Sequence, residues 1–482
     1  MRSLLEPKQI ALRINLNDKI YGSFAEIGAG QEVARYFFQA GGASGTVAKS
    51  MSAYDMQFSD DIYGKEPNGR YVTYSRLKKM LEHEYNLLEE RLRENRPNNQ
   101  FFVFADTVSA LNYKKDNRCH GWLGFRFQLS PNTPPNNVIL HIRMLDKDNL
   151  SQQVAVGLVG MNLIHACFNY IDNPNLFVQS LLDHVSPDRI KIDYIEFDGP
   201  DLKHVDNRLL SLLLVNFGFN EIAMFGPDGQ NISPSDALYK KSIITLRGRF
   251  RPVTKVHLDM LKNGLLAFEQ NVNEDNENNI ALLEITLNNL VVNEEGQIEI
   301  KDFLDRVDIL CALGQTVIIS KFKEHSMLVE YFNQFKPQRL GLIIGADNLM
   351  KVMNPDFYKN REGGILESFG ILFSNNCNLF IYPFKDPKSG VMYTSENILL
   401  HDEIKSLYKY LRLQNKMKDI IGYDETLLSI FSDDVIAQIK CGDPVWEKNV
   451  PSYVANIVKE KCLFDYPCVL VSDKLKYQKI EH

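Results

Sequence analysis

Hydrophobic positions recur with two different periods along the chain, and the change of period marks out its predicted elements. Over residues 73–95 the apolar residues follow an i, i+3, i+4 pattern and the other faces are charged. This period predicts an amphipathic helix that packs on one side. Residues 99–146 instead contain short aromatic and β-branched runs separated by Asn, Asp, Lys and Pro. That pattern predicts an antiparallel meander of strands.

Beyond residue 279, strand candidates alternate with helix candidates. The runs IALLEITL, TVIISKF, RLGLIIG and CNLFIYPF are predominantly apolar, and segments of helical period separate them. Strands that are apolar on both faces are typical of a parallel sheet covered by helices. Two further helices are predicted at 402–421 and 424–440. We therefore predict the α/β class, with a mixed N-terminal part that contains the meander and a C-terminal parallel α/β layer with a helical end.

An acidic, amide-rich stretch at residues 271–279 is the best candidate for a linker. A chain of 482 residues has the length of two to four domains of ordinary size. We predict one domain over residues 1–275, glycine-rich and mixed α/β, and a second over residues 276–482, α/β with C-terminal helices.

Glycine is concentrated in residues 22–64, where it separates predicted strands and helices. Gly28 and Gly30 match the first two glycines of a GxGxxG turn, in which the backbone and a helix N-terminus hold a pyrophosphate. The third glycine is replaced by Val33, and Glu32 adds a negative charge. A tight strand–helix turn without a ligand would use the same glycines.

A second glycine group follows at residues 41–46 and offers a nest of backbone N–H groups with hydroxyl donors and a lysine nearby. Its candidate phosphate-binding residues are Gly41, Gly42, Ser44, Gly45, Thr46 and Lys49. The alternative interpretation is a backbone packing contact.

The predicted meander carries basic residues on alternating positions. Arg126 lies on one strand, and His141 and Arg143 lie on the next. Because side chains alternate across a strand, these three share one face if the strands pair in register, and would there bind a phosphate or carboxylate. A solvated sheet face is the alternative. Cys119 and His120 are not predicted to act as a nucleophile–base pair, because adjacent residues on a strand point to opposite faces.

Polar residues follow two of the predicted strands. Asp198, Asp201 and His204 come after the strand at 189–197 and are candidate ligands for Mg²⁺, or candidate acid–base residues. A turn followed by a helix N-cap would use the same residues. The segment 345–348, GADN, follows another strand, and Lys321 and Lys385 lie near neighbouring strand ends. Ligands of open α/β sheets bind at such ends, so this group predicts a polar crevice.

Composition narrows the class of protein. The chain has 54 Lys and Arg against 61 Asp and Glu, a net charge of −7, which argues against a general nucleic-acid binder. Seven cysteines without a CxxC pair are typical of reduced thiols in the cytoplasm. No stretch of about 18 uncharged apolar residues occurs, so no membrane span is predicted. We expect a cytoplasmic protein.

Three stretches resemble a family of soluble bacterial proteins of this size that is often labelled nicotinate-nucleotide adenylyltransferase. They are EIGAGQEVARYFFQAGGASGTVAKSMSAYDMQFSDDIYG (26–64), CHGWLGFRFQ (119–128) and GLIIGADNL (341–349). Such enzymes are similar to one another in an HxGH-type motif beside a glycine-rich turn, whose histidines meet the phosphates of ATP. This sequence has no HxGH, and its first histidine, His83, lies in the amphipathic helix. The resemblance therefore assigns no catalytic residue.

Two hypotheses follow. In the first, the protein binds a nucleotide or phosphate metabolite, with ATP or an NAD-type nucleotide and Mg²⁺ as the candidates and nucleotidyl transfer as the specific activity. In the second, it is a non-catalytic scaffold or self-assembling subunit that forms a homo-oligomer, using the glycine-rich segment as the interface and aromatic residues such as Tyr36, Phe37, Phe38, Tyr54 and Phe58 as contact area.

Overall fold

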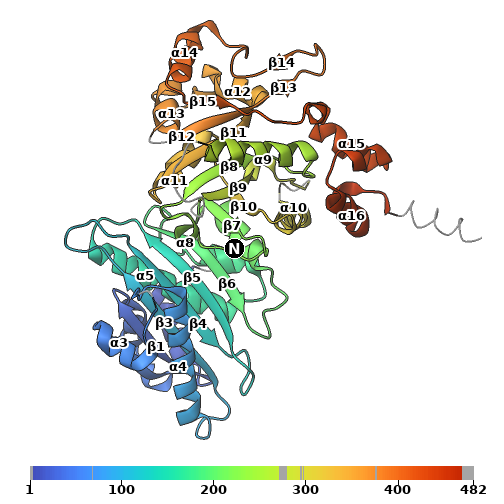
Figure 1. Ribbon diagram of the computed structural model, residues 1–482. Helices are drawn as coiled ribbons and strands as arrows, with labels where there is room; N and C mark the ends of the chain where they lie inside the picture. The colour runs from blue at the N-terminus through green and yellow to red at the C-terminus, as the bar shows by residue number, and fades with distance from the viewer. Residues whose placement is uncertain are drawn as a thin grey trace, which may run out of the picture. The chain divides into compact units, whose positions relative to one another are not determined.

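The structure is a computed structural model that describes residues 4–67, 69–270, 279–293, 296, 298–374 and 377–468. The chain forms two compact units, residues 1–223 (unit 1) and residues 224–482 (unit 2) (Figure 1). This division differs from the boundary predicted at 271–279, of which residues 271–278 lie outside the described part. The reason is that β8 (Ser242–Arg247) and β9 (Asn279–Thr286), on either side of that stretch, are parallel neighbours in the sheet of unit 2.

Unit 1 is built on a six-stranded sheet in the order β2-β1-β3-β4-β5-β6. β1 runs parallel to β2 and β3, and β3 to β6 pair antiparallel, which confirms the predicted meander. The strands are β1 (Ile20–Gly28), β2 (Val47–Met51), β3 (Gln100–Ser109), β4 (His120–Phe127), β5 (Asn136–Met144) and β6 (Ile190–Asp198).

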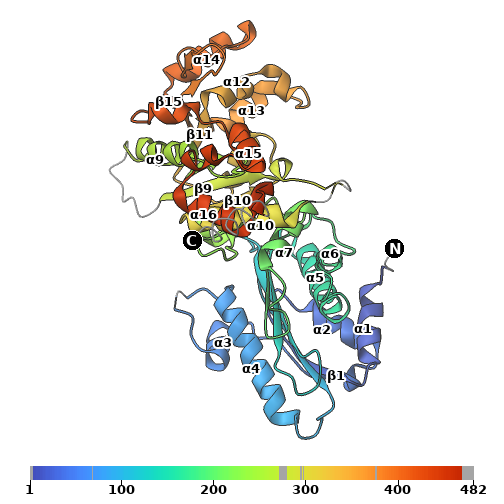
Figure 2. The ribbon, with the colours of Figure 1, turned by 90° about the vertical axis from the view of Figure 1, so that its right-hand side faces the viewer.

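Helices cover both faces of this sheet, and Figure 2 shows α4 and α5 on opposite sides of it. One face carries α3 (Met56–Tyr63) and α4 (Tyr74–Leu92), the predicted amphipathic helix, which Thr73 caps by accepting the N–H of Arg76. The helices that pack into the larger core on the other face are α1 (Pro7–Asn15), α2 (Glu32–Ala40), α5 (Asn149–Asn169), α6 (Pro174–Ser180) and α7 (Asn207–Asn216).

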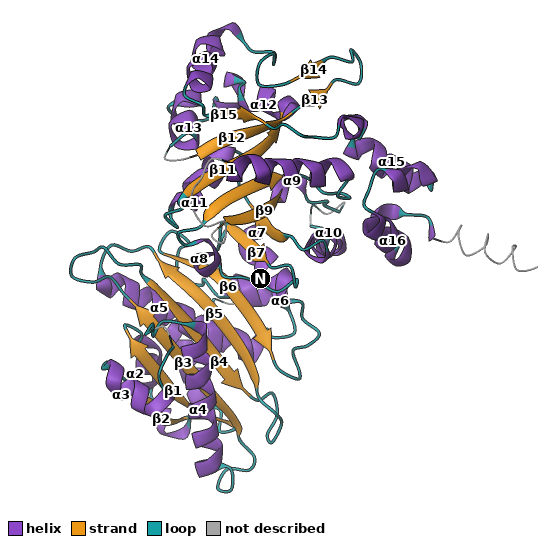
Figure 3. Cartoon of the chain, in the orientation of Figure 1, coloured by secondary structure: helices purple, strands orange, loops and turns teal. Residues whose placement is uncertain are grey.

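Unit 2 is built on a seven-stranded sheet in the order β15-β12-β11-β8-β9-β10-β7 (Figure 3). The pairs from β15 to β10 are all parallel, as the apolar runs predicted. The remaining strands are β7 (Ile222–Phe225), β10 (Thr316–Ser320), β11 (Arg339–Gly345), β12 (Cys377–Tyr382) and β15 (Met417–Asp419), with a small antiparallel pair, β13 (Phe384–Lys385) and β14 (Met392–Tyr393).

The strands of this sheet alternate with helices, and the described part of the chain ends in a helical region, as predicted. The helix predicted at 402–421 is shorter than expected, because residues 417–419 form the edge strand β15. The helices are α8 (Pro234–Leu238), α9 (Lys255–Glu269), α10 (Ile300–Ala312), α11 (His325–Asn333), α12 (Ala346–Val352), α13 (Gly364–Leu372), α14 (Lys405–Leu413), α15 (Ser432–Cys441) and α16 (Ser452–Lys461). Across the described ranges, none of the helices has the length and apolar character that crossing a membrane requires.

A disulfide joins Cys462 and Cys468, which corrects the expectation that all seven cysteines are reduced thiols. The two residues are six positions apart in the sequence, and their Cα atoms lie 5.8 Å apart, within the range that a disulfide spans. The spacing is not CxxC, so a search for that motif misses the pair.

Candidate functional site

The order of the parallel strands in unit 2 reverses beside β8. Chain order continues from β8 to β9 and β10 on one side, whereas β11 and β12 lie on the other. At such a reversal the connections leave toward opposite faces of the sheet, and a crevice remains at the carboxyl ends of the strands. A cavity of about 730 Å³ lies there, and its polar lining includes Arg249, His257, Lys323, His325, Asp347 and Asn348.

The turn after β8 forms one wall of the cavity. A buried arginine stabilises this turn through hydrogen bonds. Arg306 is fully buried and donates to the carbonyl oxygens of Arg249 (3.1 Å) and Asn289 (2.8 Å), and it forms an ion pair with Asp302. Arg249 and Asn289 both line the cavity. One guanidinium therefore fixes the turns that follow two neighbouring strands, β8 and β9.

His257 lies in the first turn of α9 and lines the cavity. Its Nδ1 accepts the backbone N–H of Thr254 at 3.0 Å and lies 2.8 Å from the Thr254 hydroxyl. Because a backbone N–H can only donate, the neutral ring carries its hydrogen on Nε2. Burial, together with the charge of Arg249, lowers the pKa of His257 to about 4. At neutral pH the imidazole is an uncharged N–H donor.

A second imidazole, that of His325 at the start of α11, lines the same cavity. Its Nδ1 is buried and has no hydrogen-bond partner among the described residues. Burial and the charge of Arg247 hold the pKa of His325 well below its ordinary value, so this ring is also neutral. A buried polar atom without a partner in a cavity lining is the kind of group that a bound ligand satisfies.

Arg247 itself is used by the fold. It donates to the carboxylate of Glu284 at 2.8 and 2.9 Å and to the carbonyl of Lys323 at 3.0 Å. Glu284 is fully buried and also accepts the hydroxyl of Ser320 at 2.6 Å. The carboxyl ends of β8, β9 and β10 are thus tied together, and the site is built on a rigid edge.

The GADN segment predicted to form a polar crevice contributes Gly345, Asp347 and Asn348 to the cavity. Lys321 and Lys385, predicted beside it, are not in the lining, whereas Lys323 and Lys351 are.

The sequence reasoning missed His257 and His325. One sequence signal could have pointed to His257. The residue lies three positions after Thr254, and both follow a strand and a glycine-containing turn at 242–250.

A carboxyl group of the same chain occupies the helix N-terminus that follows the first glycine turn in unit 1. The N–H groups of Val33 and Ala34 at the start of α2 donate to the carboxylate of Glu26 at 2.9 and 3.1 Å. A Cβ on Gly30 would lie 2.2 Å from Oδ1 of Asp106, so this glycine allows close packing on a buried carboxyl group. Gly28 has φ 78°. The helix end predicted to hold a phosphate is therefore occupied by a side chain of the same chain.

The second glycine group packs on α1. Gly41 and Gly42 have φ values of 82° and 74°, and the Asn15 amide donates to the carbonyls of Phe37 (2.9 Å) and Gly41 (2.7 Å). Of the other predicted residues, Ser44 and Gly45 lie in a short 3₁₀ turn. The Thr46 hydroxyl donates to the carbonyl of Ile14 at 3.5 Å. Lys49 forms an ion pair with Glu84. Each of these contacts is internal to unit 1.

The basic residues of the meander separate into two places. Strand register pairs His120 with Arg143, and Arg126 lies six residues further along β4, roughly 20 Å away. Arg126 donates to Asn137 at 3.0 Å. The predicted convergence of two arginines does not occur, because the register separates them along the strands. His141 and Arg143 do meet, at the carboxylate of Asp193.

The metal site predicted from Asp198, Asp201 and His204 is not assembled. Nowhere in the described ranges do three or more His, Cys, Asp or Glu side chains group so that they could hold a metal ion. Asp201 exchanges hydrogen bonds with Asn136, at 2.9 and 3.0 Å, and Asp198 accepts from Asn137 at 3.4 Å. The two carboxylates fasten the end of β6 to β5, and His204 is exposed.

No protein-family model matches the sequence, and no curated protein is similar to it at a significant level. Among solved structures, the chain is similar to the competence/damage inducible protein CihA of Agrobacterium tumefaciens over 33% of this chain and 93% of that one, at 16% identity and a TM-score of 0.23. CinA superfamily proteins of Klebsiella pneumoniae and Escherichia coli match 35% and 34% of this chain and 98% and 95% of their own, at 10% and 11% identity and TM-scores of 0.26 and 0.24. Similarity at these TM-scores assigns no function to the chain.

Proposed function

We propose that unit 2 binds a nucleotide at the carboxyl ends of its parallel strands and that nucleotidyl transfer is its activity. The observation that carries this proposal is the cavity at the strand reversal, in which two neutral imidazoles, His257 and His325, stand among lysines. Open α/β sheets bind nucleotides at this position, where backbone and side-chain donors converge on a phosphate.

The chemistry of the lining suits phosphates. The N–H of His257 donates a hydrogen bond without adding a buried charge, and Lys323 and Lys351 supply positive charge. Phosphoryl transfer is catalysed chiefly by positioning and by donors fixed in advance, which stabilise charge on the phosphoryl oxygens. The contacts of Arg306 and Thr254 provide that fixation.

The spacing of Thr254 and His257 supports the adenylyltransferase resemblance. An HxGH motif separates its histidines by two residues, and Thr254 and His257 have the same separation at the start of α9. They follow the turn that begins with Gly248, after β8. In this interpretation threonine stands in place of the first histidine, and the motif belongs to unit 2 rather than to the N-terminal glycine segment.

His257→Asn tests the proposal. The amide oxygen of Asn takes the place of Nδ1 and still accepts the Thr254 N–H, but nothing replaces the Nε2–H donor. We expect wild-type protein to bind ATP in a calorimetric titration and to release pyrophosphate from ATP with nicotinate mononucleotide. The variant should bind ATP about 10-fold more weakly, the loss of one hydrogen bond to a charged group.

The matched control is His401→Gln, an exposed histidine of unit 2 outside the cavity lining, which should leave ATP binding unchanged. A wild-type protein without a calorimetric or thermal-shift response to ATP, NAD or nicotinate mononucleotide at millimolar concentration would refute nucleotide binding. ATP binding without pyrophosphate release would retain binding and refute the transfer activity.

A second function, self-association, is favoured by exposed apolar side chains of unit 1 on the segments that flank β2. Phe38, Tyr54, Met56 and Phe58 are between 56% and 82% exposed, whereas Phe37 is buried in the core. They lie on segments before and after β2, an edge strand of the sheet. Large exposed aromatic groups are typical of interfaces. We expect light scattering to give a dimer or larger species, and Tyr54→Asp with Phe58→Asp to give a monomer. A strictly monomeric wild type would exclude this function.

A further inference from the structure

Unit 1 holds a chain of titratable side chains that runs across three neighbouring strands. His120 opens β4, His141 lies on β5 and Asp193 lies on β6. Nδ1 of His120 is 3.0 Å from Nε2 of His141, and Nδ1 of His141 forms a hydrogen bond with the carboxylate of Asp193. His141 and Asp193 are buried, and His120 is half-buried. This row of three side chains therefore leads from the interior of unit 1 toward its surface.

A β-bulge creates this arrangement. His141 pairs with Tyr194, but the next residue, Ile142, pairs with Ile192, so Asp193 is an extra residue on β6. The insertion turns the Asp193 carboxylate toward the face that carries His141. β-Bulges are over-represented next to active sites, where they re-aim a side chain.

The contacts determine where the protons lie. Burial opposes ionisation of Asp193, but His141 and Arg143, whose Nε is 3.2 Å from Oδ2, hold the pKa of this carboxyl below its ordinary value. An ionised carboxylate only accepts, so Nδ1 of His141 donates to it, and in the neutral ring Nε2 then carries the lone pair. Nδ1 of His120 must then donate to that lone pair. Nε2 of His120 is left as an unprotonated acceptor.

The outermost member of this row, His120, is a neutral imidazole. Within the described part of the chain, Nε2 of His120 makes no hydrogen bond. Burial, followed by the electrostatic effects of His141 and Arg118, lowers the pKa of His120 to about 4. The ring is therefore uncharged throughout the neutral pH range, and its Nε2 lone pair is available, as in the histidine of a carboxylate–histidine pair in hydrolases.

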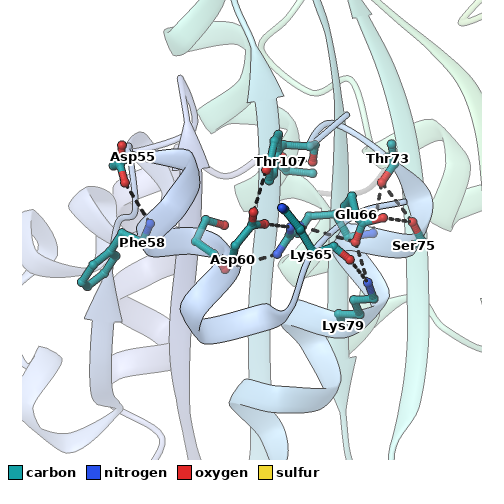
Figure 4. Close-up of polar contacts among 12 residues, drawn as sticks. Asp55, Phe58, Asp60, Lys65, Glu66, Thr73, Ser75, Lys79 and Thr107 are labelled. Carbon is teal, nitrogen blue, oxygen red and sulfur yellow. Dashed lines mark hydrogen bonds and ion pairs between the residues drawn. The ribbon is translucent and has the colours of Figure 1, made fainter. Parts of the chain in front are cut away.

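Two exposed arginines, Arg70 and Arg118, act on His120 through their charges. The segment that carries Arg70 is held in place by its neighbour Tyr71: the Thr107 hydroxyl donates to the Tyr71 carbonyl at 2.9 Å, and the Tyr71 hydroxyl donates to Asp60 at 2.8 Å. Figure 4 shows the cluster around Asp60, Glu66 and Thr107 that pins this segment. A positive charge near an imidazole base favours an anionic substrate.

We propose that His120 is the general base of a hydrolytic site in unit 1 that acts on a small anionic ester or amide, with His141 and Asp193 as positioning residues. Nε2 of His120 takes a proton from water, and the water oxygen forms a bond to the substrate carbonyl carbon. The bond from that carbon to the leaving group then breaks, and His120 returns the proton to the leaving group. Water is the only co-reactant. This site is independent of the cavity in unit 2.

The full-length protein is tested with mono-4-nitrophenyl succinate, an anionic ester, and with 4-nitrophenyl acetate, a neutral one. We expect hydrolysis of the anionic ester above the buffer rate and a loss of about 10²-fold in kcat/KM for His120→Gln, the lower end of the general-base range. Arg70→Gln should raise KM for the anionic ester with little change in kcat. His83→Gln, an exposed histidine on α4, should change neither value.

Imidazole ¹⁵N resonances give a readout that a purely structural role would not produce. Wild-type His120 should carry its proton on Nδ1, and Asp193→Asn should shift the proton toward Nε2 and lower kcat. Hydrolysis at the buffer rate, or a folded His120→Gln variant with unchanged kcat/KM, would overturn the proposal. If His120→Gln does not fold, a wild-type His120 protonated on Nε2 would overturn it. Equal rates on the two esters would overturn the anionic preference.

Discussion

Replacing Arg76 with alanine is expected to lower the free energy of unfolding of unit 1 by about 3–5 kcal/mol, the usual loss when one partner of a buried ion pair is removed. Arg76 is fully buried, and its guanidinium lies 2.9 Å from Asp60 and 3.6 Å from Glu66. It also donates to the carbonyl of Ser59 at 3.3 Å. Without Arg76, the buried Glu66 keeps Lys79, at 2.8 Å, as its ion-pair partner (Figure 4). It loses the positive charge of Arg76 at 3.6 Å.

The measurement is urea unfolding followed by the fluorescence of Trp122. Replacement of Trp446 by Phe in every variant leaves Trp122 as the single tryptophan of a chain that has two. Arg91→Ala, at an exposed position of the same helix, is the matched control and should change stability by less than about 0.5 kcal/mol. A loss below about 1 kcal/mol for Arg76→Ala would show that the buried cluster does not hold α3 and the following segment on α4.

Unit 1 is expected to become less stable as the pH rises from about 4.5 to about 7. Glu26 on β1 and Asp106 on β3 lie opposite each other and are buried. Burial raises the pKa of Glu26 from 4.5 to about 7, and burial together with the charge of Glu26 holds the pKa of Asp106 well above its ordinary value. The folded state therefore binds protons that the unfolded state has released.

The sign follows from the raised values. A group whose pKa is higher in the folded state than in the unfolded state stabilises the folded state fully at pH values below the unfolded-state pKa. This stabilisation is lost as the pH rises through the folded-state pKa. For Glu26 the change is roughly 3 kcal/mol, at about 1.4 kcal/mol for each pH unit between 4.5 and 7. Repulsion between the ionised Glu26 and Asp106 increases this loss of stability.

Asp106→Asn removes one of the two charges and should make this pH dependence shallower. Unfolding free energies measured in urea at pH 5, 6, 7 and 8, again through Trp122, provide the comparison, with the exposed Asp18→Asn as the control. The variant should be at least as stable as wild type at pH 8. A slope equal to that of wild type would mean that the two carboxyls do not titrate together.

Local patterns along the sequence determined a large part of the fold. The period of residues 73–95 predicts α4, and the apolar runs after residue 279 predict the parallel strands of unit 2. The turn residues between short aromatic runs predict the meander. These features could be predicted because helical period, strand alternation and turn composition depend on residues close together in the sequence.

The sites depended on contacts between residues far apart in the sequence. Strand register placed His120 beside Arg143 and separated Arg126 from both, and a one-residue bulge turned Asp193 toward His141. The order of the strands brought the segments after β8, β10 and β11 to one cavity. Glu26 took the helix end that the glycines suggested for a phosphate. Register, bulges and strand order are decided by the packing of the whole unit, because each pairing is stable only when distant strands and helices bury its faces.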